Sequence, residues 1–412
     1  MFDKKNEPLI IKNKDFKRCI IFISYPIINY KEEELRILEK IAFDRSKKYD
    51  TNKKIAVVNI NNYCLSYRSR ISFIGNSPFL EFTLSYPSYD CLGIDVLEDN
   101  LKFIKEIIYD PYLEDGAFPK NKVEDAKKIY KNRTIRINND FFSYYDYKND
   151  LLNDEDDYLV SKVFKDTSLL DNVTSKSLYE TYNKIISGPP LVYLIGNVDV
   201  NKSKELIKNI LLDNKISRVK FKKDYYVYAK NIPSKVDVVV EDSPFSTAGV
   251  FCNYKVKNIN CVRDTILLSV VKKLLYSNVS NILFDSLRKD NDLIYRCYVN
   301  YTMFGTLTLA SFTDKGNAKI IFDIYDSVMK KIENIDYIGD KLSLIVENAR
   351  IDNELSKENL SDILYEYIDK HLEYIEDKYY DVLKTVSGEE VYDFIKNRLV
   401  MVSKYVGGDK YE

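Results

Sequence analysis

The sequence contains a weak internal repeat, and this repeat limits the possible folds more than any other feature. Residues 20–27, IIFISYPI, resemble residues 249–256, GVFCNYKV, at an offset of 229. Residues 173–182, VTSKSLYETY, resemble residues 386–395, VSGEEVYDFI, at an offset of 213. Chance similarity between short segments is the alternative explanation. Because both offsets are close to half of the 412 residues, we favour a duplicated domain of about 200 residues.

Hydrophobic periodicity predicts strands and helices in both halves. Strand-like runs lie at 18–27, 62–74, 79–87, 191–198, 236–241, 248–256, 293–302 and 305–311. Helical stretches lie at 33–43, 97–109, 121–131, 263–276, 317–333, 341–352, 357–384 and 388–403. We read the acidic segment 147–157 as a solvated loop or helix start. Strands at hairpin-like spacing between long helices predict an α+β fold with two homologous domains, each a mostly antiparallel sheet with helices on one face.

The two halves meet near residues 187–200, where a Ser-Gly-Pro-Pro run stops a helix and a strand-like run follows. We therefore expect an N-terminal domain at 1–185, a linker at 186–192 and a C-terminal domain at 193–412.

The matched helices of the second repeat both begin after a hydroxyl side chain, Thr174 or Ser387. Only the second has Glu at the third position, Glu390, so only the second is expected to form a capping box.

Composition excludes several classes of partner and compartment. Lys and Arg number 62 against 63 Asp and Glu, so no nucleic acid or acidic membrane is indicated. No apolar run is long enough to span a bilayer, and the N-terminus has no secretory signal pattern. The six cysteines form no CxxC pair and suit a reducing compartment, at positions 19, 64, 91, 252, 261 and 297. We therefore expect a cytoplasmic protein.

The single histidine, His371, excludes whole classes of catalytic site. A chain with one imidazole cannot build a two-histidine zinc site, and no GxSxG elbow supports a serine triad. We expect His371 to be a surface residue of a polar helix.

The segment LRILEKIAF at 35–43 predicts an amphipathic helix whose polar face carries Arg36, Glu39 and Lys40. Zinc peptidases place His at the two outer positions of this spacing, as ligands, and Glu between them as general base. One interpretation is a zinc helix that has lost its ligands. The other, which this segment alone favours, is a solvated face with an Arg36–Glu39 ion pair.

Three further stretches resemble the insulinase-like (pitrilysin) family of zinc peptidases, whose members have two homologous halves. NILFDSLRKDNDLIYRCYV at 281–299 is similar to the C-terminal signature of that family. Residues 179–207 are similar to its linker and the first strand of its second half, and residues 383–400 to its closing helix. With the N-terminal stretch, these motifs occur in the family's order along nearly the whole chain.

The resemblance implies that the zinc site has been lost. Family members carry His-x-x-Glu-His on the helix after the first strand, here the degenerate zinc helix at 33–45. Arg36 and Lys40 match the two His positions, and Glu39 matches the general base. The third ligand, a Glu on a later helix, falls at Arg133 in the register that we favour. Guanidinium and ammonium groups have no lone pair for a metal, so we expect no zinc or other cofactor in this chain.

A second pair of residues matches the family. Its second half carries an Arg and a Tyr seven residues apart that bind the substrate backbone and stabilise the tetrahedral intermediate. Arg288 and Tyr295 match this pair in spacing and setting. A guanidinium and a phenol are suitable donors to a developing oxyanion. Without the resemblance, they would be read as an Arg in a surface turn and a buried strand Tyr.

The resemblance is greatest to the two-chain, processing-peptidase-like branch, in which one subunit keeps the zinc helix and the other supplies the Arg/Tyr pair. It implies a non-catalytic subunit, half of a clam-shell, that forms a heterodimer with a zinc-bearing homologue around an extended peptide. The alternative is a stand-alone peptide-binding or scaffold protein, for example a homodimer, without a proteolytic role. A hydrolase with an unrecognised site is a third reading.

Overall fold

The chain divides into two compact units, each of which combines three segments of the sequence. The computed structural model describes residues 1–74, 77–153, 161–222, 232, 236–259, 261–302, 304–373 and 379–410. Unit 1 comprises Met1–Thr134, Ser161–Tyr225 and Ser356–Tyr374, and unit 2 comprises Ile135–Val160, Tyr226–Leu355 and Ile375–Glu412. Across the described ranges, no helix has the length and apolar character needed to cross a membrane.

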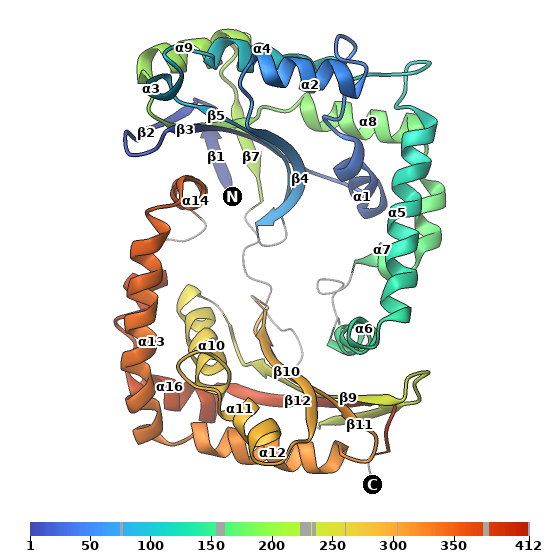
Figure 1. Ribbon diagram of the computed structural model, residues 1–412, viewed down its shortest axis with the longest axis vertical. Helices are drawn as coiled ribbons and strands as arrows, with labels where there is room; N and C mark the ends of the chain where they lie inside the picture. Colours follow the sequence, from blue (N-terminus) through green and yellow to red (C-terminus); the bar gives the residue numbers. More distant parts are fainter. Residues whose placement is uncertain are drawn as a thin grey trace. The chain divides into compact units, whose positions relative to one another are not determined.

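Unit 1 contains the N-terminal strands and the helices that pack on them (Figure 1). Its strands are β1 (Phe2–Lys5), β2 (Leu9–Lys12), β3 (Arg18–Pro26), β4 (Ser66–Ile74), β5 (Ser77–Pro87), β6 (Leu191–Gly196) and β7 (Arg218–Phe221). Its helices are α1 (Glu32–Ile41), α2 (Asn52–Asn61), α3 (Tyr89–Leu92), α4 (Leu97–Tyr109), most of α5 (Lys120–Asn139), α7 (Lys162–Lys165), η1 (Thr167–Asn172), α8 (Ser175–Ile186), α9 (Val200–Ile210) and α14 (Leu360–Leu372).

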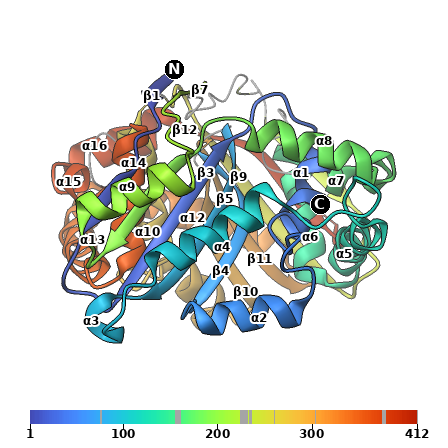
Figure 2. The same ribbon diagram turned by 90° about the horizontal axis from the view of Figure 1, so that it is seen from above.

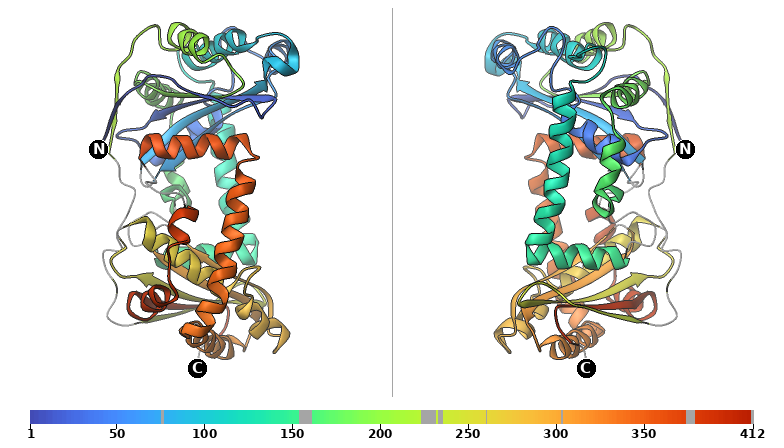
Figure 3. Two further views of the ribbon diagram at one scale, coloured as in Figure 1. Left: turned by 90° about the vertical axis from the view of Figure 1, so that its left-hand side faces the viewer. Right: turned by 90° about the vertical axis from the view of Figure 1, so that its right-hand side faces the viewer.

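The five-stranded sheet of unit 1 has the order β2-β6-β3-β5-β4, and β1 pairs separately with β7. Strand β2 runs parallel to β6, whereas the other neighbours are antiparallel. Alternate residues of β3 point to opposite faces, so Ile21 and Ile23 join one apolar cluster and Ile20 and Phe22 join another. Figure 2 shows α4 and α9 crossing the first face, and Figure 3 shows α14 along the second.

Unit 2 contains a second five-stranded sheet, of order β10-β11-β9-β12-β8. Its strands are β8 (Asp237–Glu241), β9 (Thr247–Val256), β10 (Ile294–Tyr301), β11 (Thr306–Asp314) and β12 (Leu399–Gly407). Its helices are α6 (Phe141–Asn153), α10 (Val262–Leu275), α11 (Ile282–Phe284), the π-helix η2 (Asp285–Lys289), α12 (Ala318–Ile332), most of α13 (Ile335–Ser356), α15 (Tyr379–Leu383), α16 (Gly388–Asp393) and the π-helix η3 (Phe394–Arg398).

The two sheets have the same topology, which confirms the duplicated α+β fold. Phe22 of β3 pairs with Thr83 and Tyr193, and Phe251 of β9 pairs with Ala310 and Tyr405. Each sheet has one parallel pair at an edge, β2 with β6 and β8 with β12. The sheets are therefore mixed, with antiparallel pairs in the majority as expected.

Each unit takes one helix from the other half of the sequence. Helix α6 packs on β9 of unit 2 through Tyr145, and α14 packs on the sheet of unit 1 through Leu364 and Ile368. The expected linker at 186–192 lies inside unit 1. The division at 1–185, 186–192 and 193–412 describes the repeat in the sequence, and it remains a prediction. The two compact units are defined by packing, which follows the apolar faces of these helices.

Two expected helices differ from the structure. Residues 388–403 form α16 and η3 only as far as Arg398, and then become strand β12, which pairs with β9 and β8. Residues 357–384 are interrupted because Glu373 ends α14 with a left-handed backbone, at a φ of 55°. The segment 147–157 is helical as far as Asn153, the end of α6, and residues 154–157 lie outside the described ranges.

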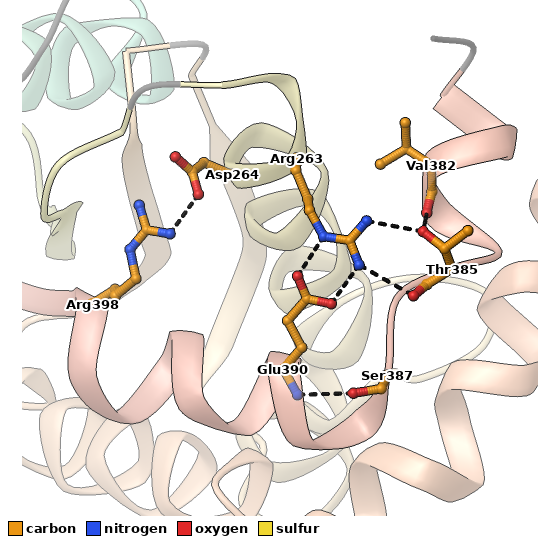
Figure 4. Close-up of polar contacts among 7 residues, drawn as sticks. All are labelled: Arg263, Asp264, Val382, Thr385, Ser387, Glu390 and Arg398. Atoms are coloured by element: carbon orange, nitrogen blue, oxygen red, sulfur yellow. Dashed lines mark hydrogen bonds and ion pairs between the residues drawn. The ribbon is translucent and has the colours of Figure 1, made fainter.

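The capping prediction was reversed. Helix α8 has the reciprocal capping box, between Thr174 and Ser177. At α16, Ser387 accepts a bond from the backbone N–H of Glu390, at 3.2 Å. The Glu390 carboxylate turns instead to Arg263 on α10, as Figure 4 shows.

Candidate functional site

The segment that we expected to be a degenerate zinc helix forms α1, a short amphipathic helix on the sheet of unit 1. Its first turn carries Glu32, Glu33 and Glu34, which the helix dipole favours at that end. Leu35 and Leu38 are buried in the main core of the unit and hold the helix in place. Arg36, Glu39 and Lys40 therefore lie on the remaining, more exposed side.

Arg36 pairs with Glu32 one turn earlier, and the expected Arg36–Glu39 pair was wrong. The Nε and Nη2 atoms of Arg36 donate to Oε1 of Glu32 at 3.2 and 3.1 Å. Glu32 also accepts from the Ser161 hydroxyl and from the backbone N–H of Lys162 at 3.0 Å. The guanidinium is thus part of the contact between α1 and α7.

Glu39 has a different partner, Tyr130 of α5. The Tyr130 hydroxyl donates to Oε2 of Glu39 at 2.8 Å, and the Tyr130 side chain is almost fully buried. Burial, together with the neighbouring Glu39 charge, raises the pKa of Tyr130 well above its ordinary value. The phenol therefore stays protonated and acts as a donor, and Glu39 connects α1 to α5.

Lys40 and Arg133 both lie against aromatic rings of this cluster. Nζ of Lys40 is 5.8 Å from the ring centroid of Tyr130, and Cζ of Arg133 is 4.8 Å from that of Phe164. The rings of Tyr130 and Phe164 are 6.3 Å apart. The positive charges of Arg36 and Arg133 each lower the pKa of Tyr130, against the larger effect of burial. Both guanidinium groups are therefore near the phenol.

These residues do not fit a zinc ion. Zinc needs imidazole, thiolate or carboxylate ligands, and the three residues at the expected ligand positions, Arg36, Lys40 and Arg133, are all cations. Within the described ranges, no three His, Cys, Asp or Glu side chains lie close enough together to hold a metal. Without ligands at positions 36 and 40, Glu39 would have no metal-bound water to deprotonate, and its Oε2 already accepts a hydrogen bond from Tyr130.

Arg288 and Tyr295 lie in unit 2, on either side of the turn between η2 and β10. Nη1 of Arg288 donates to the backbone carbonyl of Ile294 and forms an ion pair with Asp292 at 3.1 Å. The Tyr295 hydroxyl donates to the Asp314 carboxylate, and this bond raises the pKa of Tyr295. Tyr295 is 57% exposed, so it is not the buried strand residue that the alternative reading expected.

His371 is more enclosed than a surface helix residue. Its Nδ1 lies 2.8 Å from the Tyr193 hydroxyl, and its ring contacts Phe2 edge-on at 5.8 Å. Burial lowers its pKa. His371 is therefore only partly exposed, because α14 packs its last turns on the sheet.

Comparisons with known proteins identify the family. Residues 172–338 match the peptidase M16 inactive domain. Over 205 residues, the chain is 23% identical to the probable inactive metalloprotease YmfF of Bacillus subtilis (strain 168). The chain is thus similar to inactive homologues of the M16 peptidases. M16 is the insulinase-like family, so the resemblance and the expectation of no activity of its own are confirmed.

The matched part spans 48% of this chain and 48% of the Bacillus relative, about half of each. Solved structures match the fold over nearly the whole chain. A conserved protein from Enterococcus faecalis V583 has a TM-score of 0.81 at 16% identity, with 98% of this chain and 96% of that chain covered. A peptidase M16 inactive domain from Pseudomonas fluorescens has a TM-score of 0.65 at 12% identity, with 98% and 95% covered.

Three side chains that bind the family-matched residues were not predicted from the sequence. Glu32 lies four residues before Arg36, a spacing that predicts an ion pair on a helix. Tyr130 lies one turn before Arg133, so a helix through both residues would have placed it on the same face. Asp314 carries no local signal, because it reaches Tyr295 only through the pairing of β10 with β11.

Proposed function

We propose that this M16 homologue is the non-catalytic subunit of a heterodimeric zinc peptidase. It would pair with a homologue that keeps the His-x-x-Glu-His helix, and zinc would be bound only there. The observation that carries the proposal is an exposed Arg288 and Tyr295 in a chain whose own α1 has cations at the ligand positions. The closed chamber of the heterodimer would admit extended peptides.

The chemistry of the pair suits a contribution to the partner's site. The backbone carbonyl of Ile294 holds one end of the Arg288 guanidinium, and the side chain is 46% exposed. Its remaining N–H groups can donate to a peptide carbonyl or to the oxyanion of a tetrahedral intermediate. The protonated Tyr295 phenol can donate in the same way once it leaves Asp314.

Substrate would be held mainly through its backbone. A peptide that adds as a strand to the edge of a sheet gains main-chain hydrogen bonds whatever its sequence, so unfolded chains are favoured over folded ones. We also propose a cytoplasmic location, since the cysteines at all six positions are free thiols.

The test is to measure peptide cleavage by a zinc-bearing M16 partner with and without this chain. We expect Arg288→Ala plus Tyr295→Ala to lower the kcat of the complex about a hundredfold, as is typical for loss of oxyanion donors. Equal cleavage with the double variant would overturn the proposed contribution.

The matched control is Arg350→Ala plus Tyr367→Ala. Arg350 is 47% exposed at the side chain and Tyr367 is 43% exposed, close to the values of the proposed pair. We expect no loss of kcat in this control. Size-exclusion of the chain alone and after co-expression with the partner separates the heterodimer from a stand-alone peptide-binding or scaffold protein.

A further inference from the structure

Helix α2 of unit 1 has apolar residues on the side that faces away from the core. Ile55 is buried in the main core of the unit, and Val58 packs against the same core. Because an α-helix turns by about 100° per residue, Val57 and Ile60 point in roughly the opposite direction. Their side chains are 49% and 73% exposed. A surface helix normally has polar residues at such positions, so this outer face is typical of a helix that another molecule covers.

The apolar surface continues beyond the end of the helix. Tyr63 and Leu65 follow α2 and are 45% and 58% exposed. We use the name α2 patch for these two residues together with the exposed Ala56, Val57 and Ile60 of the helix. Single exposed apolar side chains are common, but a group of them within one short segment indicates an interaction surface.

The two ends of the α2 patch carry opposite charges. Lys53 is exposed in the first turn of α2. At the other end α2 contacts α4, where the Asn62 side chain donates to the backbone carbonyl of the exposed Asp99 at 3.1 Å (Figures 1 and 2 show α2 beside α4). The neighbouring charges form ion pairs with each other, Lys54 with Asp50 and Glu98 with Lys102. The patch is therefore positive where α2 begins and negative where it ends.

We propose that the α2 patch is the interface of a homodimer, with a second copy of this chain as its occupant. About a twofold axis the same patch faces itself, so the two α2 helices run approximately antiparallel. An axis level with position 58 places Ala56 of one copy opposite Ile60 of the other, and the small side chain leaves room for the large one. The same register brings Lys53 of one copy to the end of α2 in the other, next to its Asp99.

The charges favour a second copy over an unrelated protein. A patch with a cation at one end and an anion at the other is complementary to itself after half a turn. The inference goes beyond the proposed function, because it involves neither Arg288 nor Tyr295 and needs no zinc-bearing partner. Since the patch is small compared with the interfaces of stable dimers, the dimer should be weak, with a Kd of about 10 µM.

The test is sedimentation velocity of the isolated full chain at concentrations from about 1 to about 200 µM. We expect the fraction of dimer to rise over this range. Ile60→Glu places a carboxylate in the apolar contact and should raise the Kd at least about tenfold. The matched control is Ile129→Glu on α5, since Ile129 is a 54% exposed isoleucine of the same unit and lies outside the patch. It should leave the Kd unchanged.

Charge reversal tests the register of the two helices. Lys53→Glu places two like charges together at each end of the interface, and Asp99→Lys does the same. Each change alone should therefore raise the Kd about fivefold. The double variant restores opposite charges and should return the Kd close to that of the unmodified chain.

Three results would overturn the inference: a chain that stays monomeric at the highest concentration, equal losses in Ile60→Glu and Ile129→Glu, or a double variant that dimerises no better than the single ones. If the chain alone is monomeric and Ile60→Glu weakens binding to a zinc-bearing partner, the patch belongs to that interface and the homodimer is refuted. The assay contains neither partner nor peptide, so its failure leaves the proposed function intact. A failed cleavage test likewise leaves the homodimer intact.

Discussion

At the scale of single residues, the positions that the family resemblance assigns to a lost zinc site form a point of contact between two helices. A metal at this position would join α1 to a later helix through its ligands. In this chain the Tyr130 hydroxyl makes the connection by donating to Glu39, and Lys40 covers the Tyr130 ring. Glu39 therefore has a structural role that does not depend on catalysis, which explains its presence beside two cations.

This role predicts a measurable loss of stability in Tyr130→Phe. The change leaves the partly buried Glu39 carboxylate without its donor, so we expect a loss of about 1.5 kcal/mol. Glu39→Gln should cost less, because the amide oxygen can still accept the bond. Urea unfolding gives both values, with Tyr367→Phe as an exposed control. A loss in the control as large as that in Tyr130→Phe would contradict the assignment.

At the scale of elements, two arginines fix the place where the final helix turns into a strand. Arg398 ends η3, and it pairs with Asp264 and donates to the backbone carbonyls of Lys257 and Asn258 (Figure 4 shows the pair with Asp264). Arg263 binds Glu390 through two parallel hydrogen bonds of 2.5 and 2.6 Å. Both contacts tie the start of α10 to the α16–η3 segment, which positions β12 between β9 and β8 in the sheet.

Substitution of the two arginines should lower the free energy of unfolding by different amounts. The Asp264 side chain is only 4% exposed, so Arg398→Ala leaves a nearly buried carboxylate unpaired and should cost about 3 kcal/mol. Arg263 and Glu390 are 37% and 30% exposed, so Arg263→Ala should cost about 1 kcal/mol. Denaturant midpoints test the order. If Asp264→Asn does not rescue part of the Arg398→Ala loss, burial of the unpaired charge is not its cause.

At the scale of the whole molecule, few groups have a pKa between those of ordinary carboxylic acids and those of cysteine thiols. The chain has one histidine, and burial lowers the pKa of His371. On the same helix, burial raises the pKa of Asp369 to about 6. Folding is favoured by a protonated Asp369 and a neutral His371, so the two groups oppose each other as pH rises through this range.

Asp369→Asn should therefore stabilise the protein only at higher pH. A raised folded-state pKa means that the stability due to Asp369 is complete below its unfolded pKa of 3.8 and is lost as pH rises through about 6. Since Asp369 keeps part of its solvent contact, we expect a gain of about 2 kcal/mol near pH 8 and almost none near pH 4. Thermal unfolding of both forms at the two pH values measures this. The same gain at both would refute the assignment.

Several properties of this protein follow from the sequence alone. The repeat between residues 20–27 and 249–256 predicted a duplicated α+β fold, because each half must bury the same pattern of apolar residues. The single imidazole, at His371, and the cations at Arg36 and Lys40 do not fit the family's zinc chemistry, because ligand chemistry depends on residue type. Such features are local or compositional, so they can be read without coordinates.

Only the tertiary structure decided what depends on distant partners. Residues 399–407 follow a helix without a break, yet they form β12 because β9 and β8 offer a ladder of hydrogen bonds. Glu39 binds Tyr130, 91 residues away, and not the neighbouring Arg36. Helices α6 and α14 cross to the sheet of the other half because their apolar faces are buried there. In each case a long-range contact outweighs local preference, and the sequence pattern does not record which contact forms.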